Sequence, residues 1–299
     1  MKHIVCFSGG KDSTALVLWA KENLAEFTTV FCDTGWEHPI TYAYVEEINQ
    51  TQLGGKLVTL KSEKYDGFVQ LCVDRNRIPS VRGRFCTDEL KVFPLHKYYE
   101  SLDDEITAYQ GIRSDESAKR ATYEMTQWVN EGGGYWVQRP LLHCSVDDVF
   151  AIHRRHGVKP NPLYLMNHSR VGCWPCVMMS LRELKRILCP ELKTRLRELE
   201  RFVNENVSNK ETRKWLATFF AAGTIPDRFC SLKQLVDCRK CDATGELSGA
   251  QCPRCKGQKE YMAYVPTVDD VFRYLDSVDE DQLPLLPARS CMSVYNLCE

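Results

Sequence analysis

Hydrophobic and polar positions along the first part of the chain predict strands and helices in alternation. Short apolar runs at 4–7, 28–32 and 56–60 have the length of β-strands. Apolar side chains at 13–25 and 41–52 recur at helical spacing. Strands that alternate with helices form parallel sheets, because each helix returns the chain to begin the next strand in the same direction. We therefore predict an α/β fold with a doubly wound parallel sheet.

Later segments change this pattern. A run at 105–109 is expected to return to the sheet, and 181–206 is predicted to be helical and strongly charged. The charges of 181–206 fit either a solvated helix face or a contact with nucleic acid. From Val268 onward the chain is acidic and is expected to dock on the rest of the protein.

Composition and charge narrow the class of protein. The 299 residues are 43% hydrophobic and 26% charged, which excludes a disordered or fibrous chain. A formal charge of −1 excludes a protein that grips nucleic acid by bulk charge alone, although a local basic patch stays open. No apolar run is long enough for a signal peptide or a membrane span, so we expect a soluble, cytoplasmic protein. Fifteen cysteines in such a chain favour metal binding or chemistry over disulfides.

A glycine-rich turn joins the first predicted strand to the first predicted helix. In such a turn, backbone N–H groups point at a bound anion, and glycine lets a phosphate approach closely. Lys11 adds a charge and Ser13 a hydroxyl donor. The turn predicts a phosphate site whose spacing differs from the Walker A motif. An ordinary turn, with Asp12 or Ser13 capping the helix, is the simpler alternative. The turn consists of Ser8, Gly9, Gly10, Lys11, Asp12 and Ser13.

This turn resembles the pyrophosphate loop of the ATP pyrophosphatase superfamily, the adenine nucleotide alpha hydrolases. Those enzymes cleave ATP between the α and β phosphates and adenylate an oxygen. Three further motifs, at 31–39, 111–120 and 139–164, resemble the phosphoadenosine phosphosulfate (PAPS) reductase family and follow in the family's order. The resemblance covers about residues 1–180 and implies an adenine nucleotide alpha hydrolase-like fold there.

The resemblance also implies which residues hold an adenine nucleotide. The loop would hold the departing pyrophosphate, the segment after the second strand would line the adenosine, and 111–120 would contact the charged end. Without the other motifs, the charged residues of 111–120 would be an ordinary surface salt-bridge cluster. The implied nucleotide-binding residues are Ser8, Gly9, Gly10, Lys11, Asp12, Ser13, Asp33, Thr34, Gly35, Gly111, Arg113, Glu116, Ser117 and Arg120. The implied catalytic residues are Lys11, Asp12, Arg113 and Arg120.

Cys86, Cys173 and Cys176 resemble three of the four cluster ligands of the iron–sulfur members of the PAPS reductase family. In those members, thiolates hold a [4Fe–4S] cluster beside the nucleotide. Here Phe85 stands where the family has the first cysteine. Either another cysteine completes the set, or one iron is open and can present sulfide, as in the tRNA thiolation enzymes. A zinc site, a redox pair or inert thiols are the alternatives. The candidates for a fourth ligand are Cys72, Cys144 and Cys189.

Four later cysteines form two Cys-x-x-Cys knuckles with ten residues between them. Four thiolates at this spacing can surround one Zn²⁺ tetrahedrally. Glycines after each knuckle allow tight turns, and neighbouring basic residues offset the charge of a zinc–thiolate centre. We predict a zinc ribbon. It either stabilises the fold as a structural metal site or forms a surface that contacts nucleic acid. The four cysteines are Cys238, Cys241, Cys252 and Cys255.

Two differences separate the chain from the sulfonucleotide reductases that it resembles. Those reductases carry a catalytic cysteine in a Glu-Cys-Gly-(Leu/Ile)-His tail, whereas this sequence has only Cys298 near its end. Their phosphate loop is usually degraded, whereas Ser8–Ser13 is intact. Both differences favour ATP cleavage over sulfonucleotide reduction.

Three functions follow as hypotheses. The first is an ATP-dependent sulfurtransferase that resembles the DNA phosphorothioation enzyme. ATP with Mg²⁺ would adenylate an acceptor such as nucleic acid, and sulfur from a cysteine desulfurase would pass through the cluster. The second is a PAPS or adenosine phosphosulfate reductase that releases sulfite with electrons from thioredoxin. The third is a non-catalytic zinc-ribbon protein that binds nucleotide or nucleic acid.

These patterns divide the chain into four predicted parts. They are a nucleotide-binding domain at 1–180, a helical region at 181–230, a zinc ribbon at 231–265 and a C-terminal tail at 266–299.

Overall fold

The described residues form two compact units. The structure is a computed structural model, and it describes residues 1–81, 83–206, 215–238, 241, 244–247 and 250–283. The first unit comprises Met1–Leu71 and Arg84–Ile187, and the second comprises Cys72–Gly83 and the described part of 188–284. Each unit is described by itself below.

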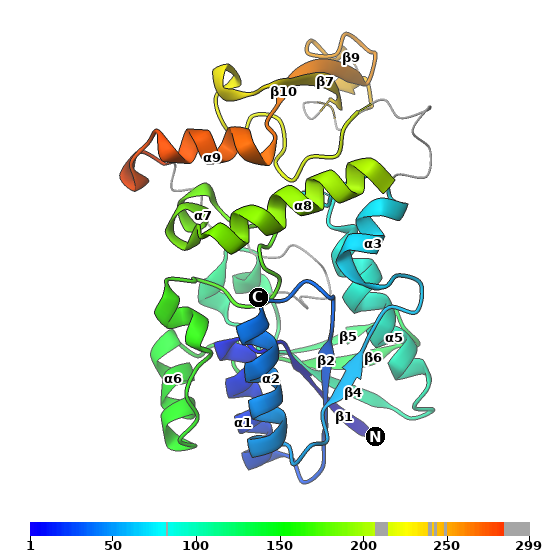
Figure 1. The fold of residues 1–299 in the computed structure, drawn as a ribbon. Helices are drawn as coiled ribbons and strands as arrows, with labels where there is room; N and C mark the ends of the chain where they lie inside the picture. Colours follow the sequence, from blue (N-terminus) through cyan, green and yellow to red (C-terminus); the bar gives the residue numbers. More distant parts are fainter. Residues whose placement is uncertain (82, 207–214, 239–240, 242–243, 248–249, 284–299) are drawn as a thin grey trace. The chain divides into compact units, whose positions relative to one another are not determined.

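A six-stranded sheet in the order β3-β2-β1-β4-β6-β5 forms the centre of the first unit (Figure 1). Four neighbouring pairs are parallel, and β5 alone runs antiparallel, to β6. The predicted parallel sheet is therefore confirmed, with an antiparallel edge strand that the sequence pattern did not predict. The strands are β1 (Lys2–Phe7), β2 (Thr28–Cys32), β3 (Val58–Leu60), β4 (Ile106–Tyr109), β5 (Thr126–Val129) and β6 (Tyr135–Gln138).

Helices cover both faces of this sheet (Figure 1). Ile4 and Val5 are neighbours in β1, yet they belong to different apolar clusters, because side chains alternate across a strand. Val5 packs with α1, α2 and α6, whereas Ile4 packs with α5. The sheet is thus doubly wound, as predicted. The helices of this part of the chain are α1 (Lys11–Asn23), α2 (Pro39–Gln52), α3 (Gly67–Asp74), α4 (Phe85–Thr87), α5 (Phe93–Glu100), α6 (Val146–Arg155) and α7 (Leu181–Ile187).

Strand order decides where a ligand can bind in the first unit. The chain leaves β1 on one side to form β2, and β4 pairs on the other side of β1. In open α/β sheets, ligands bind at the carboxyl ends of the strands where the order reverses in this way. The predicted phosphate loop follows β1, and two other predicted segments follow β2 and β4, so the topology brings all three to this edge.

The described part of the second unit contains the long helix α8, the shorter helix α9 and two small antiparallel strand pairs. In α8, Leu192, Leu196, Leu199 and Val203 form a buried stripe at helical spacing. The predicted helix at 181–206 is interrupted, because α7 ends at Ile187 and α8 begins with a proline, which suits the first position of a helix. The elements are α8 (Pro190–Asn206), β7 (Leu232–Asp237), β8 (Glu246–Leu247), β9 (Ala250–Gln251), β10 (Glu260–Val265) and α9 (Val268–Asp276).

The acidic helix α9 packs on α8 within the second unit. Arg197 Nη2 lies 2.7 Å from Asp269 Oδ1, and Lys193 Nζ lies 3.8 Å from Asp276 Oδ2. Acidic side chains of α9 therefore neutralise part of the basic face that the sequence offered as a nucleic-acid contact. No helix in the described part of the chain combines the length and apolar character that crossing a membrane requires.

Candidate active site

The predicted phosphate loop lies between β1 and α1, and its backbone requires glycine at one position. Gly9 has a φ of +81°, and a Cβ there would lie 3.0 Å from Val45 Cγ2 and 3.1 Å from Thr41 Cγ2. The adjoining Gly10 is the N-cap of α1, so it offers no side chain to the helix end. The loop therefore packs directly against α2 and leaves its backbone N–H groups at the start of a helix.

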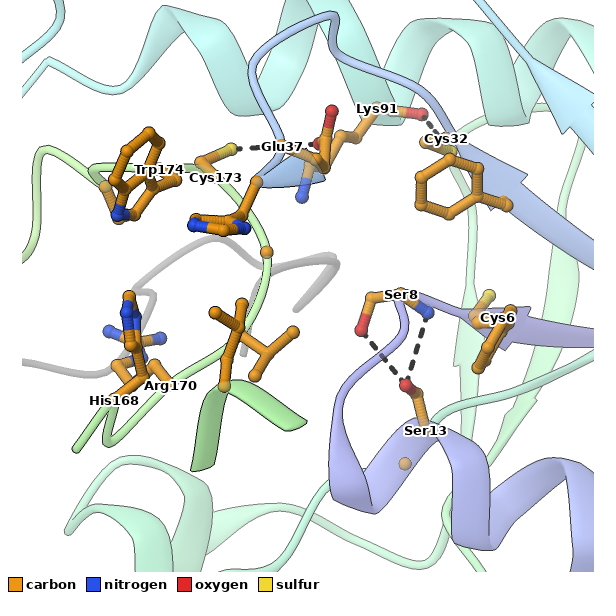
Figure 2. A pocket seen from close by; sticks show the side chains of 18 of the residues that line it. Cys6, Ser8, Ser13, Cys32, Glu37, Lys91, His168, Arg170, Cys173 and Trp174 are labelled. Atoms are coloured by element: carbon orange, nitrogen blue, oxygen red, sulfur yellow. Dashed lines mark hydrogen bonds between the residues drawn. The ribbon is translucent and has the colours of Figure 1, made fainter. Parts of the chain in front are cut away.

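Two hydroxyl oxygens accept hydrogen bonds from these N–H groups. The backbone N–H of Ser8 donates to Ser13 Oγ at 3.2 Å (Figure 2). The backbone N–H of Gly10 donates to the same oxygen, also at 3.2 Å. The N–H of Lys11 donates to the phenol oxygen of Tyr164 at 3.0 Å. In the turn that the sequence predicted as a phosphate site, side-chain oxygens therefore accept hydrogen bonds from three backbone N–H groups.

Asp12, predicted as a catalytic residue, is fully buried behind the loop. Its Oδ1 accepts from Arg113 Nε at 2.6 Å, and its Oδ2 lies 2.8 Å from Lys11 Nζ. Arg120 is also buried and pairs with Glu116. Arg113 and Arg120 are therefore not part of an exposed salt-bridge cluster, because both guanidinium groups are held inside the protein by acids.

A cavity opens beside the loop at the carboxyl edge of the sheet (Figure 2). It encloses about 1130 Å³, a figure that includes the open solvent at its mouth. Of the predicted nucleotide-binding residues, Ser8, Ser13 and Gly111 line it. The other predicted nucleotide-binding residues are not among those that line this cavity.

Three basic side chains that the sequence analysis did not select also line the cavity: Lys91, His168 and Arg170 (Figure 2). Lys91 belongs to a π-helical turn at Asp88–Val92 and is largely buried. Burial lowers the pKa of His168, which favours its neutral form near pH 7. Lysine and arginine inside a cavity suit an anionic ligand. A π-turn is common at functional sites but leaves no reliable sequence signal.

The predicted adenosine segment is held by its own side chains. Asp33 Oδ1 accepts from Tyr42 Oη at 2.6 Å and from the N–H of Gly35 at 2.9 Å, and Lys61 Nζ lies 3.1 Å from Asp33 Oδ2. Burial alone would raise the pKa of Asp33, but these partners outweigh it and lower that pKa. Asp33 is therefore an ionised carboxylate that orders the turn after β2.

Backbone hydrogen bonds bring the Cys173 segment beside this turn. The N–H of Trp174 donates to the carbonyl of Trp36 at 2.8 Å, and Glu37 forms an isolated bridge with Cys173. The Cys173 thiol lies 4.0 Å from Glu37 Oε1 (Figure 2), and it lies 3.7 Å from Thr34 Oγ1. Residues about 140 positions apart in the chain thus meet at one side of the cavity.

Cys86, Cys173 and Cys176 all line a second, smaller cavity that adjoins the first. The two cavities share Lys91 and Arg170 as well as Cys173 and Cys176. The structure therefore brings together the three cysteines that the sequence grouped. Their sulfur atoms do not form a group compact enough for a single ion. The thiolates of an iron–sulfur cluster bind different irons and so stand farther apart.

None of the three candidates for a fourth cluster ligand lines either cavity. Burial raises the pKa of Cys72 and of Cys144, and Cys189 belongs to the second unit. Cys298 lies outside the described residues. The described part of the chain therefore offers three cysteines at the smaller cavity, with Phe85 preceding Cys86 in the chain.

Comparison with known proteins identifies the family. Residues 2–179 match the model of the phosphoadenosine phosphosulfate reductase domain. This match spans more than half of the chain and includes the loop, the three cysteines, the smaller cavity and all of the residues that line the larger one except Glu183. The chain belongs to the PAPS reductase domain family. The resemblance drawn from the sequence motifs is confirmed at this level.

Individual relatives of this PAPS reductase-domain protein cover different shares of it. An uncharacterized 37.8 kDa protein of Escherichia phage 186 is 34% identical over 76% of this chain and 81% of the relative. The adenosine 5′-phosphosulfate reductase of Deinococcus radiodurans is 29% identical over 49% of this chain and 55% of the relative. The solved PAPS reductase of Candida auris, in a phosphate complex, has 17% identity and a TM-score of 0.47 over 59% of this chain and 83% of that one. The chain spans little more than half of the Deinococcus enzyme.

The four later cysteines lie outside the residues that match the PAPS reductase domain. Cys238 Sγ is 3.7 Å from Cys252 Sγ, Cys241 Sγ is 3.7 Å from Cys255 Sγ, and all four sulfur atoms lie within 4.8 Å of one another. The hairpin of β7 and β10 carries the two knuckles, and all four thiols are buried. These residues form a compact group that can hold one metal ion, as their spacing predicted.

Proposed function

We propose that this protein binds ATP in the cavity beside Ser8–Ser13, cleaves it between the α and β phosphates, and adenylates an acceptor. The observation that carries the proposal is that Ser8 and Ser13 of the predicted phosphate loop line the same cavity as Cys173 and Cys176. Lys91 and Arg170 add positive charge to the same cavity. ATP would place its β and γ phosphates on the loop and its adenosine toward the turn after β2.

The first step is displacement at the α phosphorus. An acceptor oxygen forms a bond to that phosphorus, and the bond to the oxygen that bridges the α and β phosphates breaks. The pair of electrons leaves with pyrophosphate, whose charge Lys11 and the loop N–H groups stabilise, with Mg²⁺ as the usual companion of ATP. Asp12 orients Lys11, and Arg113 holds Asp12 in place. Arg113 is thus a positioning residue in this mechanism.

The second step replaces the activated oxygen by sulfur. Reduced sulfur attacks the carbon or phosphorus that carries the adenylated oxygen, and AMP leaves with that oxygen. Cys86, Cys173 and Cys176 would hold a [4Fe–4S] cluster, which supplies a site for reduced sulfur when bound. A nucleic acid base or phosphate is the acceptor class that we favour, and a cysteine desulfurase is the expected sulfur donor.

Sulfonucleotide reduction is the second candidate, because several relatives carry the name adenosine 5′-phosphosulfate reductase at 25–29% identity. The same cavity would then hold adenosine 5′-phosphosulfate or its 3′-phosphorylated form. Two electrons from thioredoxin would cleave the sulfur–oxygen bond to give sulfite together with AMP from the first substrate or adenosine 3′,5′-bisphosphate from the second. The intact phosphate loop would have no pyrophosphate to bind in that reaction, so we rank this candidate second.

We also propose that Cys238, Cys241, Cys252 and Cys255 hold Zn²⁺. Zinc–sulfur bonds of about 2.3 Å in a tetrahedron put neighbouring sulfur atoms about 3.8 Å apart. The two measured separations of 3.7 Å fit that edge. Four thiolates leave no open position on the metal, so the zinc would stabilise the ribbon and take no part in catalysis.

One experiment separates the two enzymatic candidates. Anaerobically purified protein is incubated with ATP, with and without nucleic acid, and separately with adenosine 5′-phosphosulfate and reduced thioredoxin. Pyrophosphate release that Lys11→Ala abolishes supports ATP cleavage, whereas sulfite release supports reduction. Lys21→Ala is the matched control, because Lys21 is in the same helix but bonds Gln52 at the exposed surface. Binding of nucleotide without either product would support a non-catalytic role.

A further inference from the structure

Three side chains from one later segment hold the backbone of the phosphate loop. His153 Nε2 donates to the carbonyl of Lys11 at 2.8 Å, and Asn161 Nδ2 donates to the carbonyl of Gly9 at 3.2 Å. Tyr164 accepts from the N–H of Lys11 at 3.0 Å. His153 and Asn161 are almost fully buried, and Tyr164 is half-buried. The segment 153–164 therefore braces the loop from the side of α6.

Tyr164 differs from the other two in the kind of group that it holds. His153 and Asn161 bind carbonyl oxygens, which are hydrogen-bond acceptors and therefore cannot donate to the ionised oxygens of a phosphate. The N–H of Lys11 is the first of α1, and N–H groups at this position are the ones that bind anions. The phenol oxygen of Tyr164 thus occupies the position of an anion oxygen.

We propose that Tyr164 is a positioning residue that weakens phosphate binding: a bound pyrophosphate group displaces its hydroxyl oxygen from the N–H of Lys11. The inference rests on the proposed function, which puts the β and γ phosphates on this loop. A charged phosphate oxygen is a stronger acceptor for the N–H of Lys11 than the neutral hydroxyl of Tyr164. Binding of the phosphate is nevertheless weakened, because the hydrogen bond between Lys11 and Tyr164 must break first. Release of pyrophosphate after cleavage is helped by the same bond, because Tyr164 takes the N–H back.

A single substitution isolates the hydroxyl group. Lys11 Nζ lies 5.4 Å from the centre of the Tyr164 ring, and Tyr164→Phe keeps that ring contact while it removes the oxygen. The N–H of Lys11 then has no bond to this residue that a phosphate must break. Because one neutral hydrogen bond contributes modestly to net free energy, we expect binding of inorganic pyrophosphate to tighten about 2- to 10-fold.

The test compares two ligands and two tyrosines in the full chain by calorimetry. Tyr164→Phe should bind inorganic pyrophosphate more tightly than the wild type does. Its affinity for adenosine should be unchanged, because adenosine carries no phosphate. Tyr44→Phe is the control, since the Tyr44 hydroxyl bonds the carbonyl of Lys159 at 2.8 Å rather than a loop N–H. Tyr164→Leu, which also removes the hydroxyl, should tighten pyrophosphate if the phenylalanine variant does not fold.

The outcomes distinguish this inference from the proposed function. If the wild-type protein binds neither pyrophosphate nor ATP, the proposed function fails and the inference fails with it. If the wild-type protein binds pyrophosphate but Tyr164→Phe binds it equally well or more weakly, only the inference is overturned. Weaker binding would mean that the hydroxyl is itself a phosphate ligand. General damage to the fold would weaken both ligands and would not produce tighter binding of one.

Discussion

The ion pair behind the phosphate loop is expected to contribute strongly to the stability of the first unit. Arg113 Nε lies 2.6 Å from Asp12 Oδ1, the arginine side chain is 4% exposed, and the aspartate is 0% exposed. In Arg113→Met, the buried Asp12 carboxylate loses its guanidinium partner and keeps its contact with Lys11 Nζ at 2.8 Å. Removing one partner of a buried pair costs about 3–5 kcal/mol, because the other charge stays buried.

This loss in the free energy of unfolding corresponds to a fall in the melting temperature. For a unit of this size, about 1 kcal/mol shifts the midpoint by about 2–4 °C, so Arg113→Met should lower it by at least about 6 °C. Arg155→Met is the control, because Arg155 makes a similar pair with Glu22 at the surface, with the arginine side chain 55% exposed. Such exposed pairs contribute about 0.2–1 kcal/mol. Fluorescence suits the assay, because the first unit contains five of the six tryptophans, at 19, 36, 128, 136 and 174.

A double-mutant cycle tests the cause of the loss. Asp12→Asn removes the buried charge, so adding it to Arg113→Met should cost less than the sum of the two single losses, by about 2 kcal/mol. Equal effects of Arg113→Met and Arg155→Met, or strictly additive losses in the cycle, would refute the argument from burial.

Two further predictions concern the second unit. Cys241→Ser should reduce bound zinc by about one ion per chain in elemental analysis and should lower the stability of the ribbon, whereas Cys144→Ser should leave the zinc content unchanged. An equal zinc content in the two variants would contradict the four-cysteine site. Glu200 is buried, and burial raises its pKa to about 7. This pKa is above that of a glutamate in the unfolded chain, so folding favours the protonated carboxyl. The stability that the protonated Glu200 contributes is therefore complete below about pH 4.3, and it is lost as the pH rises through 7. Urea unfolding should therefore show a steeper loss of stability between pH 5 and 8 in the wild type than in Glu200→Gln; parallel curves would disprove this assignment.

Local sequence signals were sufficient where neighbours in the chain act together. The loop at Ser8–Ser13 lies within one strand–turn–helix unit, so the glycine positions and the apolar periodicity on either side predict its place. The two Cys-x-x-Cys knuckles are equally local, since short turns bring their thiols together. Interruption of 181–206 at Pro190 also has a local cause, although the charged helical pattern on both sides concealed it.

Contacts between distant segments could not be derived from such signals. Asp12 meets Arg113 across 101 positions, and Thr34 meets Cys173 across 139. Lys91 lines the cavity because it belongs to a π-helical turn, and the sequence around Lys91 does not predict that turn. Family resemblance grouped some of these positions, but it did not indicate that Arg113 and Arg120 are buried against acids.

The sequence by itself determined the first three strands and the two helices between them, the glycine turn and the two cysteine knuckles, because hydrophobic period, glycine turns and cysteine spacing act over a few residues. Tertiary structure decided which predicted residues face the cavity, which are buried counter-ions, and that Tyr164 accepts from the phosphate loop. The physical reason is the strand order: crossovers place the ends of β1, β2 and β4 at one edge, and only packing of later segments on that edge completes the site.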